Sequence, residues 1–228
     1  MAVIDEKRRA AEAALAHVTD GMTLGVGTGS TVEIFIDLLT EKVAADELSI
    51  ITVPSSFATG HRLRAAGFRV ECLTSISVCP LAVDGADEVD GELALIKGGG
   101  AALLREKILA EIAQEFIVIV DQRKLVPKLG VKTPVPVEVI PPGLSLSLKR
   151  IKELGGTPKI RQGQSKAGPV ITDNGNFIVD VIFPEISDAA QMDAQLISIP
   201  GVIETGLFPH QADVVYVGTD SDTKRLTR

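Results

Sequence analysis

The segment Phe116-Ile117-Val118-Ile119-Val120 decides how the fold of this 228-residue chain is interpreted. An unbroken apolar run of this length is typical of a parallel strand that is buried on both of its faces. Around it, shorter apolar runs alternate with segments of helical spacing, which predicts an α/β fold with a doubly wound, Rossmann-like and mostly parallel sheet. The expected strands are Met22–Val26, Ser49–Val53, Arg69–Leu73 and Pro80–Val83, and the expected helices are Asp5–Val18, Val32–Leu39, Phe57–Ala66 and Ala101–Ile112.

The composition of the sequence changes near Lys132, after which several prolines flank the next apolar run. From there the predicted order is strand, helix, strand, strand, helix, strand, which is the ferredoxin-like pattern. The expected elements are Val135–Ile140, Leu144–Leu154, Lys159–Gln162, Phe177–Phe183, a helix capped by Asp188 and ending at Ile199, and Val202–Phe208. A last strand, Asp213–Val217, is expected to return to the first sheet. We therefore predict an α/β catalytic domain of residues 1–131 and 207–228 and a smaller ferredoxin-like α+β domain of residues 132–206.

Composition excludes several classes of function. The net charge is −7, with one Tyr and no Trp, which argues against a nucleic-acid surface. The longest apolar run is too short to cross a bilayer, and the N-terminus begins an amphipathic helix rather than a signal peptide. Cys72 and Cys79 form no disulfide framework, so we expect two buried thiols. Together these features predict a soluble cytoplasmic protein that contacts neither nucleic acid nor membrane.

The stretch Lys97-Gly98-Gly99-Gly100 precedes the expected helix at Ala101. A glycine-rich turn that opens a helix lets backbone N–H groups converge on an anion, and Lys97 adds a cation there. On that helix Glu106 shares its face with apolar residues, among them Leu109 and Ala110. Apolar surroundings would suit a proton shuttle. The alternative, which spacing leaves equally open, is a surface glutamate paired with a nearby Arg or Lys.

Two further polar loops follow expected strands. Gly25–Thr31 lacks the last glycine of a dinucleotide loop and the lysine of a P-loop, so a single phosphate-like anion fits better, with a plain capped turn as the alternative. Asp84-Gly85-Ala86-Asp87 offers two carboxylates for Mg²⁺ or sugar hydroxyls, or is a solvated acidic turn. Because ligands of open α/β sheets bind at the carboxyl ends of strands, we expect these loops to form one cleft with Ser55-Ser56 and with Asp121–Lys124.

Other chemistry finds little support in the sequence. His17, His61 and His210 are scattered, with the first two in expected helices, and they are interpreted as surface or capping residues. No serine lies in a nucleophile elbow, so covalent catalysis is not expected. The remaining set of an anion loop, a lysine, two aspartates and a glutamate suits proton abstraction beside the carbonyl of a small phosphorylated sugar.

These motifs resemble ribose-5-phosphate isomerase of the A type. The likeness is carried by Gly25–Thr31, Val83–Glu88, Lys97–Leu103 with Arg105–Lys107, and Pro136–Val139, and it continues through Arg161-Gln162, Thr172–Asn176 and Gly206–Phe208. The resemblance implies interconversion of ribose 5-phosphate and ribulose 5-phosphate in the pentose phosphate pathway, through an enediol and without a cofactor or metal. It also implies a homodimer or homotetramer.

The resemblance further implies roles for individual residues. Glu106 would be the base that moves a proton between C1 and C2, and Asp84 would help to open the furanose ring. Asp87 and Lys97 would position and polarise the O1 and O2 oxygens. The residues expected to hold the substrate and its phosphate are Lys7, Thr28, Gly29, Ser30, Thr31, Gly85, Ala86, Gly98, Gly99, Gly100 and Lys124.

Two stretches depart from the family pattern: the loop Gln164–Pro169 is longer, and Pro209-His210-Gln211 replaces an Asn-Arg-Gly-like stretch. Both lie outside the motifs, so they bear on oligomer contacts. Two alternative functions are a sugar-phosphate deaminase or CoA-transferase relative, which ammonia release would reveal, and a ligand-sensing module. A sensor would need a DNA-binding helix-turn-helix, for which we expect no room in this sequence.

Overall fold

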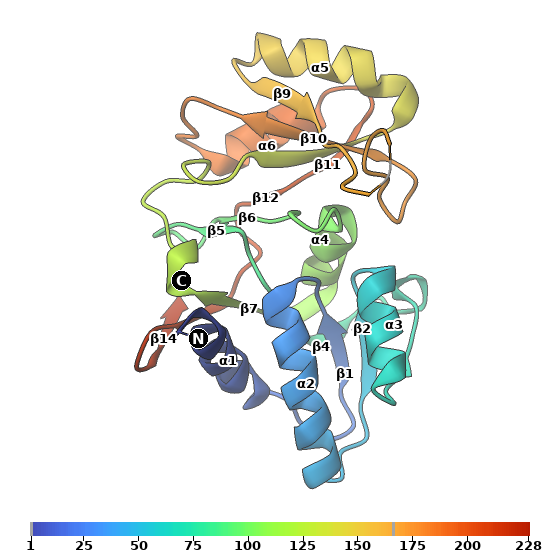
Figure 1. Ribbon diagram of the computed structural model, residues 1–228, viewed down its shortest axis with the longest axis vertical. Coiled ribbons are helices and arrows are strands. Elements are labelled where there is room, and N and C mark those ends of the chain that lie inside the picture. Colours follow the sequence, from blue (N-terminus) through green and yellow to red (C-terminus); the bar gives the residue numbers. More distant parts are fainter. Residues whose placement is uncertain (1, 166) are drawn as a thin grey trace. The chain divides into compact units, whose positions relative to one another are not determined.

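The computed structural model describes residues 2–165 and 167–228, so Met1 and Lys166, the latter within the loop Gln164–Pro169, lie outside the described residues. The described chain divides into two compact units. Unit 1 contains the residues up to Ala86, Arg105–Lys124 and Gln211–Arg228, and unit 2 contains Asp87–Leu104 and Leu125–His210. Figure 1 labels elements of both units.

The sheet of unit 1 is mostly parallel and runs in the order β14-β13-β7-β4-β1-β2-β3. Its strands are β1 (Thr23–Val26), β2 (Ile51–Pro54), β3 (Arg69–Val70), β4 (Cys79–Asp84), β7 (Ala113–Asp121), β13 (Val214–Gly218) and β14 (Thr223–Thr227). The β13–β14 pair is antiparallel, and the other neighbouring strands are parallel. Strand order reverses between β1 and β4, which places a topological switch point at the carboxyl ends of these two strands.

Helices cover both faces of this sheet (Figure 1). Leu24 and Val26 of β1 pack in one core with α1 (Ala2–Leu15) and α2 (Ser30–Ala45), and α3 (Phe57–Ala65) contributes Leu63 to the same core. Gly25 points to the other face, where an added Cβ would lie 2.8 Å from Cδ1 of Leu109 on α4 (Leu103–Ile112). Since side chains alternate across a strand, α4 covers the face opposite α2, and the doubly wound prediction is confirmed.

Unit 2 contains an antiparallel sheet in the order β11-β8-β10-β9. Its elements, in chain order, are β8 (Val135–Val139), α5 (Leu144–Glu153), β9 (Thr157–Ile160), β10 (Phe177–Ile182), α6 (Ala189–Ile197) and β11 (Val202–Thr205). Val135, Val137 and Val139 enter a core with Ile151 of α5 and Leu196 of α6, which leaves the alternate residues of β8 on the opposite face. The order of elements and strands confirms the ferredoxin-like prediction.

A second, smaller sheet in unit 2 accounts for the main differences from the sequence-based expectations. It is formed by β12 (Leu207–Phe208), β6 (Leu95–Ile96) and β5 (Glu88–Val89). Through this sheet, residues 87–104 and 207–210 belong to unit 2. Residues 125–131 belong to it as well, because Val126 and Leu129 join its core. The expected division gave all three segments to the α/β domain.

The expected strand Val202–Phe208 breaks at Gly206, so that β11 and β12 belong to different sheets. Gly206 donates its N–H to the carbonyl of Pro136 (2.7 Å), and its own carbonyl accepts from Lys97 N (2.9 Å). A Cβ at this position would lie 2.2 Å from the Lys97 carbonyl oxygen, so glycine is required where the backbones meet.

Several element boundaries also differ from expectation. The first helix ends at Leu15 rather than Val18, α2 extends to Ala45, and β3 stops at Val70, where a loop and the 3₁₀ turn η1 (Leu73–Ser75) follow. The polar edge strand β14 was not expected, because Thr223–Thr227 has little apolar character. Within the described residues, no helix has the length and apolar character needed to span a membrane.

Candidate active site

The loops after β1 and β4 meet at the switch point of unit 1. The Oδ1 atom of Asp84, which is fully buried, accepts the N–H of Thr28 (3.1 Å) and that of Gly85 (2.7 Å). Gly27 permits this approach, since a Cβ there would lie 1.9 Å from Cγ of Asp84. The alternative of a solvated acidic turn is therefore wrong for Asp84.

The hydroxyl of Thr28 lies in a cluster of hydroxyl groups that come from the turn after β2 and from the first turn of α3. Its Oγ1 is 2.9 Å from Oγ of Ser55, 2.8 Å from Oγ of Ser56 and 3.1 Å from Oγ1 of Thr59. Thr59 donates onward to the carbonyl of Gly27 (2.8 Å), and Ser56 caps α3 by accepting from Thr59 N (3.1 Å). Sequence reasoning missed Thr59, although its spacing three residues after a capping serine was a usable signal.

The start of α2 has the features of an anion site. Gly29 precedes the helix with φ 131°, a conformation that favours glycine, and Ser30 and Thr31 begin the helix. Lys7 of α1 donates from Nζ to Oγ of Ser30 (2.8 Å), which brings a cation to the positive end of the α2 dipole.

Lys124 lies in the 3₁₀ turn η2 (Gln122–Lys124), which is tied to α1 by a residue that sequence reasoning missed. Glu6 of α1 is buried and accepts from both the backbone N (3.3 Å) and Nε2 (3.0 Å) of Gln122. Glu6 thereby links the segment that carries Lys124 to the helix that carries Lys7.

Glu106 lies on α4 and is 3% exposed. Its neighbours Leu109 and Ala110 are also buried. The expected apolar arc is confirmed, and the alternative of a surface glutamate is wrong. The preceding residue, Arg105, stacks its guanidinium 4.4 Å from the ring centroid of Phe57.

In unit 2, the glycine loop (Gly98–Gly100) is held by Asp87 and by the small sheet of β5, β6 and β12. Oδ2 of Asp87 accepts the N–H of Gly99 (2.8 Å), while Lys97 is 2% exposed with Nζ 5.5 Å from the ring centroid of Phe208. Gly98 (φ 101°) and Ala101 (φ 59°) turn the chain, so α4 begins at Leu103 rather than at Ala101. The loop therefore precedes the helix by two residues more than the sequence indicated.

The structure assigns the candidate residues to two groups. Unit 1 holds Lys7, Thr28, Gly29, Ser30, Thr31, Asp84, Gly85, Ala86, Glu106 and Lys124, and unit 2 holds Asp87, Lys97, Gly98, Gly99 and Gly100. The chain passes directly from one group to the other between Ala86 and Asp87 and along α4. That the loops share one cleft stays a prediction.

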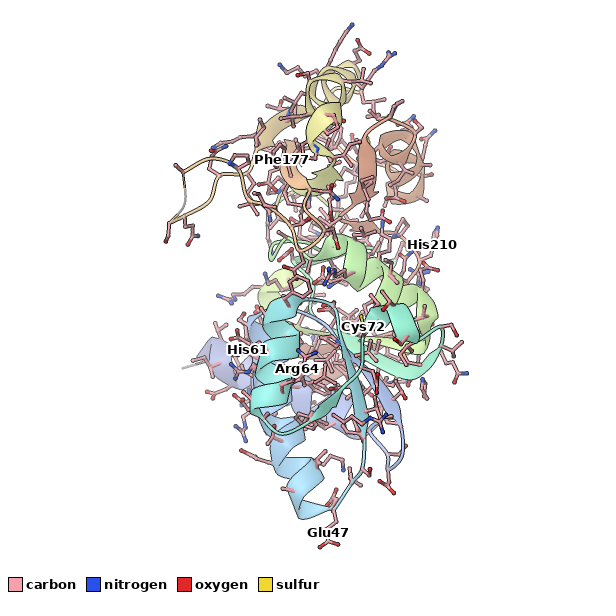
Figure 2. The ribbon with its side chains drawn as sticks, turned by 90° about the vertical axis from the view of Figure 1, so that its right-hand side faces the viewer. Glu47, His61, Arg64, Cys72, Phe177 and His210 are labelled. Atoms are coloured by element: carbon pink, nitrogen blue, oxygen red, sulfur yellow. The ribbon has the colours of Figure 1, made fainter. Side chains whose placement is uncertain are left out.

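Histidines and cysteines lie elsewhere. His17 follows α1 rather than lying within it, with Nδ1 3.0 Å from Oε2 of Glu115 and Nε2 2.8 Å from the hydroxyl of Tyr216. His61, on α3, and His210 are both exposed (Figure 2). In the described part of the chain, no His, Cys, Asp and Glu side chains group in a way that could hold a metal ion.

The expectation of two buried thiols is wrong for Cys72, which is exposed because β3 ends before it (Figure 2). A hydrogen bond from the Thr74 hydroxyl lowers the pKa of the Cys72 thiol, whereas burial raises the pKa of the Cys79 thiol.

Comparison with known proteins identifies the family. The family model described as ribose 5-phosphate isomerase A (phosphoriboisomerase A) matches residues 51–222. This chain belongs to the ribose 5-phosphate isomerase A family. It is 46% identical to the ribose-5-phosphate isomerase A of Thermosynechococcus vestitus over 228 residues, covering 100% of this chain and 97% of that protein. It is also 46% identical to that of Pyrococcus abyssi over 229 residues, with both chains covered completely.

Solved structures of the same family match the whole fold. A D-ribose-5-phosphate isomerase in complex with phospho-erythronic acid superposes with a TM-score of 0.97 at 46% identity, covering 100% of both chains. The ribose 5-phosphate isomerase A of Methanocaldococcus jannaschii gives a TM-score of 0.94 at 43% identity, covering 97% of this chain and 98% of that one. The resemblance inferred from the motifs is thus confirmed at the level of the family.

Proposed function

We propose that this chain catalyses the interconversion of D-ribose 5-phosphate and D-ribulose 5-phosphate, the aldose–ketose isomerisation of the non-oxidative pentose phosphate pathway. The observation that carries this proposal is 46% identity, along the full chain, to proteins named for that reaction. The reaction moves the carbonyl group from C1 to C2 of the open-chain sugar and needs no net oxidant.

Glu106 is the proposed base. It removes the proton from C2, the electron pair of that bond forms the C1=C2 double bond of an enediol, and O1 takes up a proton. O2 then loses its proton, and C1 receives one as the ketose forms. The burial of this carboxylate among apolar neighbours on α4 supports the assignment, because it limits competition from water.

Lys97, Asp87 and the glycine loop are proposed to act on the reacting oxygens. Negative charge develops on O1 and O2 as the proton leaves carbon. A buried ammonium together with the backbone N–H groups of Gly98 and Gly100 stabilises it, while the N–H of Gly99 donates to Asp87. The Asp87 bond to Gly99 N supports this role by ordering the loop. Asp84, beside Gly85 and Ala86, is proposed to accept the proton of the C1 hydroxyl as the furanose opens. In this step the bond between C1 and the ring oxygen breaks, C1 becomes the aldehyde carbon, and the ring oxygen takes up a proton.

The phosphate is proposed to bind at Thr28–Thr31 with Lys7 and Lys124. The contact from Lys7 Nζ to Ser30 and the start of α2 support this, since both favour an anion. We further propose that the enzyme works without a cofactor or metal, in the cytoplasm, as a homodimer or homotetramer.

The decisive experiment measures conversion of ribose 5-phosphate to the ketose with a chelator present. We expect turnover by the wild type and a loss of about 10²–10⁴-fold for Glu106→Gln, because the amide cannot accept the proton. The matched control is Glu111→Gln on the same helix, where the exposed carboxylate accepts from Gln211 (2.9 Å) and should tolerate the change.

An inactive wild type, or release of ammonia from an amino sugar phosphate, would overturn the isomerase assignment. An active Glu106→Gln variant would leave the isomerase in place and move the base to another carboxylate.

A further inference from the structure

Arg161 contacts the back of the glycine loop. It follows β9 in unit 2, and its Nη1 donates to the carbonyl of Gly98 (2.9 Å) and to that of Gly99 (3.0 Å). The same guanidinium donates from Nε to Oδ2 (2.9 Å) and from Nη2 to Oδ1 (2.5 Å) of Asp180 on β10. One side chain therefore joins two successive carbonyls of the loop to a fixed carboxylate.

The direction of these carbonyls sets the direction of the loop's N–H groups. The peptide groups of this loop are trans, so the C=O of one residue and the N–H of the next point in opposite directions. Because the Gly98 carbonyl points at Arg161, the N–H of Gly99 points away from it, and there it meets Oδ2 of Asp87 (2.8 Å). By the same geometry, the Gly99 carbonyl turns the N–H of Gly100 away from Arg161.

We infer that Arg161 is a positioning residue of the isomerisation, which acts through the glycine loop by fixing the two peptide planes of Gly98–Gly99 and Gly99–Gly100. It touches no reacting atom in this role. The inference rests on the proposed function, in which Lys97 and the N–H groups of Gly98 and Gly100 face the developing charge on the sugar oxygens.

The support for Arg161 is itself ordered. Its side chain is 18% exposed and that of Asp180 is 22% exposed, so the pair is better shielded than an ordinary surface ion pair. Asp180 lies on β10, which is paired on both sides, opposite Lys159 of β9 and Pro136 of β8. A bidentate guanidinium–carboxylate pair adds directional specificity. Through Arg161 and Asp180, the flexible glycines are thus hydrogen-bonded to a fixed position on the sheet of unit 2.

Preorganisation is the physical reason that this contact matters for rate. Three glycines in a row have large conformational freedom, and donors that must reorient during the reaction lose much of their stabilising effect. Misplacement of catalytic groups by about 1 Å can cost on the order of 10²-fold in rate. An arginine that holds two adjacent carbonyls removes much of this freedom before substrate binds.

The experiment compares Arg161→Ala, Arg161→Lys and Asp180→Asn with Arg150→Ala, a matched control on α5 whose exposed guanidinium pairs with Glu153 (2.9 Å). For Arg161→Ala we expect kcat to fall on the order of 10²-fold, with KM changed much less because Lys7 and Ser30 are untouched. Arg161→Lys should restore little of the loss, since one ammonium cannot reproduce the planar fork. Asp180→Asn should lower kcat about 10-fold by loosening the guanidinium.

Chemical rescue separates positioning from bulk stability. Guanidinium ion at millimolar concentration should raise kcat of Arg161→Ala by occupying the vacated position, while leaving the wild type and Arg150→Ala unchanged. If Arg161→Ala fails to fold, Asp180→Asn decides through its kcat and KM. Amide hydrogen exchange should also show faster exchange at Gly99 in the Arg161 variants.

The outcomes distinguish this inference from the proposed function. An active wild type with undiminished kcat in folded Arg161→Ala, or in Asp180→Asn when the former does not fold, overturns the inference alone. Loss of kcat that follows loss of thermal stability, without rescue by guanidinium, also overturns it. A wild type that does not isomerise ribose 5-phosphate overturns both.

Discussion

Asp84 and Glu138 are both fully buried carboxylates, one in each unit, and their surroundings differ. Asp84 ends the parallel strand β4 at the switch point, and its Oδ1 accepts backbone N–H groups of Thr28 and Gly85. Glu138 lies within the antiparallel strand β8, and its Oε1 accepts from side chains of one turn: Thr172 Oγ1 (2.8 Å), Asn174 Nδ2 (3.0 Å) and Asn176 Nδ2 (2.8 Å).

Because both carboxylates are buried and hydrogen-bonded, these two features do not by themselves distinguish a carboxylate proposed to be catalytic, such as Asp84, from a structural one. Strand position does more, because a strand end at a switch point borders a ligand site, whereas a carboxylate within a strand can serve to hold a neighbouring turn. The two residues should therefore respond to the same chemical change, loss of charge at constant shape, in opposite ways.

The largest effect is expected for Asp84→Asn. The amide oxygen keeps the bonds from Thr28 and Gly85 N–H, but the side chain can no longer take up a proton, so we expect kcat to fall about 10²–10⁴-fold. Thermal unfolding should stay close to that of the wild type. Steady-state kinetics and calorimetry on the same preparation provide the test, and near-normal turnover would remove Asp84 from the mechanism.

Glu138→Gln should give the reverse pattern. The three donors of the Thr172–Asn176 turn lose a charged acceptor, and we expect a loss of about 1–3 kcal/mol in the free energy of unfolding with little change in kcat. Urea unfolding measures it. The control is Glu153→Gln on α5, an exposed ion pair whose loss should cost less than about 1 kcal/mol. A large kcat effect with unchanged stability would contradict the structural role.

Much of the fold and part of the site followed from the sequence for one physical reason. A parallel strand buried on both faces needs an unbroken apolar run, and the polar residues after such runs meet at one sheet edge, as Thr28 and Asp84 do. Thr28 follows the end of β1 and Asp84 ends β4, so the positions of the expected strands along the chain were sufficient to predict that the two residues lie near each other.

The remaining contacts could not be predicted because their partners are backbone groups or lie far away along the chain. Arg161 binds backbone carbonyls 63 and 62 residues away, and any sequence supplies such acceptors. Gly206 breaks an expected strand because another backbone passes close to it, which is a tertiary effect. Glu6 was interpreted only as part of an amphipathic helix, although it is buried against Gln122.

Asp121 tests whether position at a strand end is sufficient, and the smallest effect is expected here. Like Asp84 at the end of β4, it is a buried carboxylate at the carboxyl end of a strand, here β7, and it forms an ion pair with Arg123. Its Oδ1 accepts from Nε (2.8 Å) and its Oδ2 from Nη2 (3.1 Å) of Arg123. Burial alone would raise the pKa of Asp121, but the hydrogen bonds and charge of Arg123 outweigh it and hold the pKa below 3.8.

A folded-state pKa below the unfolded value means that the ionised carboxylate stabilises the native state above the unfolded pKa. That contribution is lost as the pH falls through the lower, folded-state pKa. We therefore expect Asp121→Asn to be less stable than the wild type near neutral pH, and the difference to shrink as the solution is acidified below pH 3.8. Denaturant unfolding at a series of acidic pH values measures it, with kcat expected to change little. A difference that did not depend on pH would show that the Arg123 pair contributes no stability. A large loss of kcat would place Asp121 with Asp84, so that position at a strand end would be sufficient for a role in the reaction.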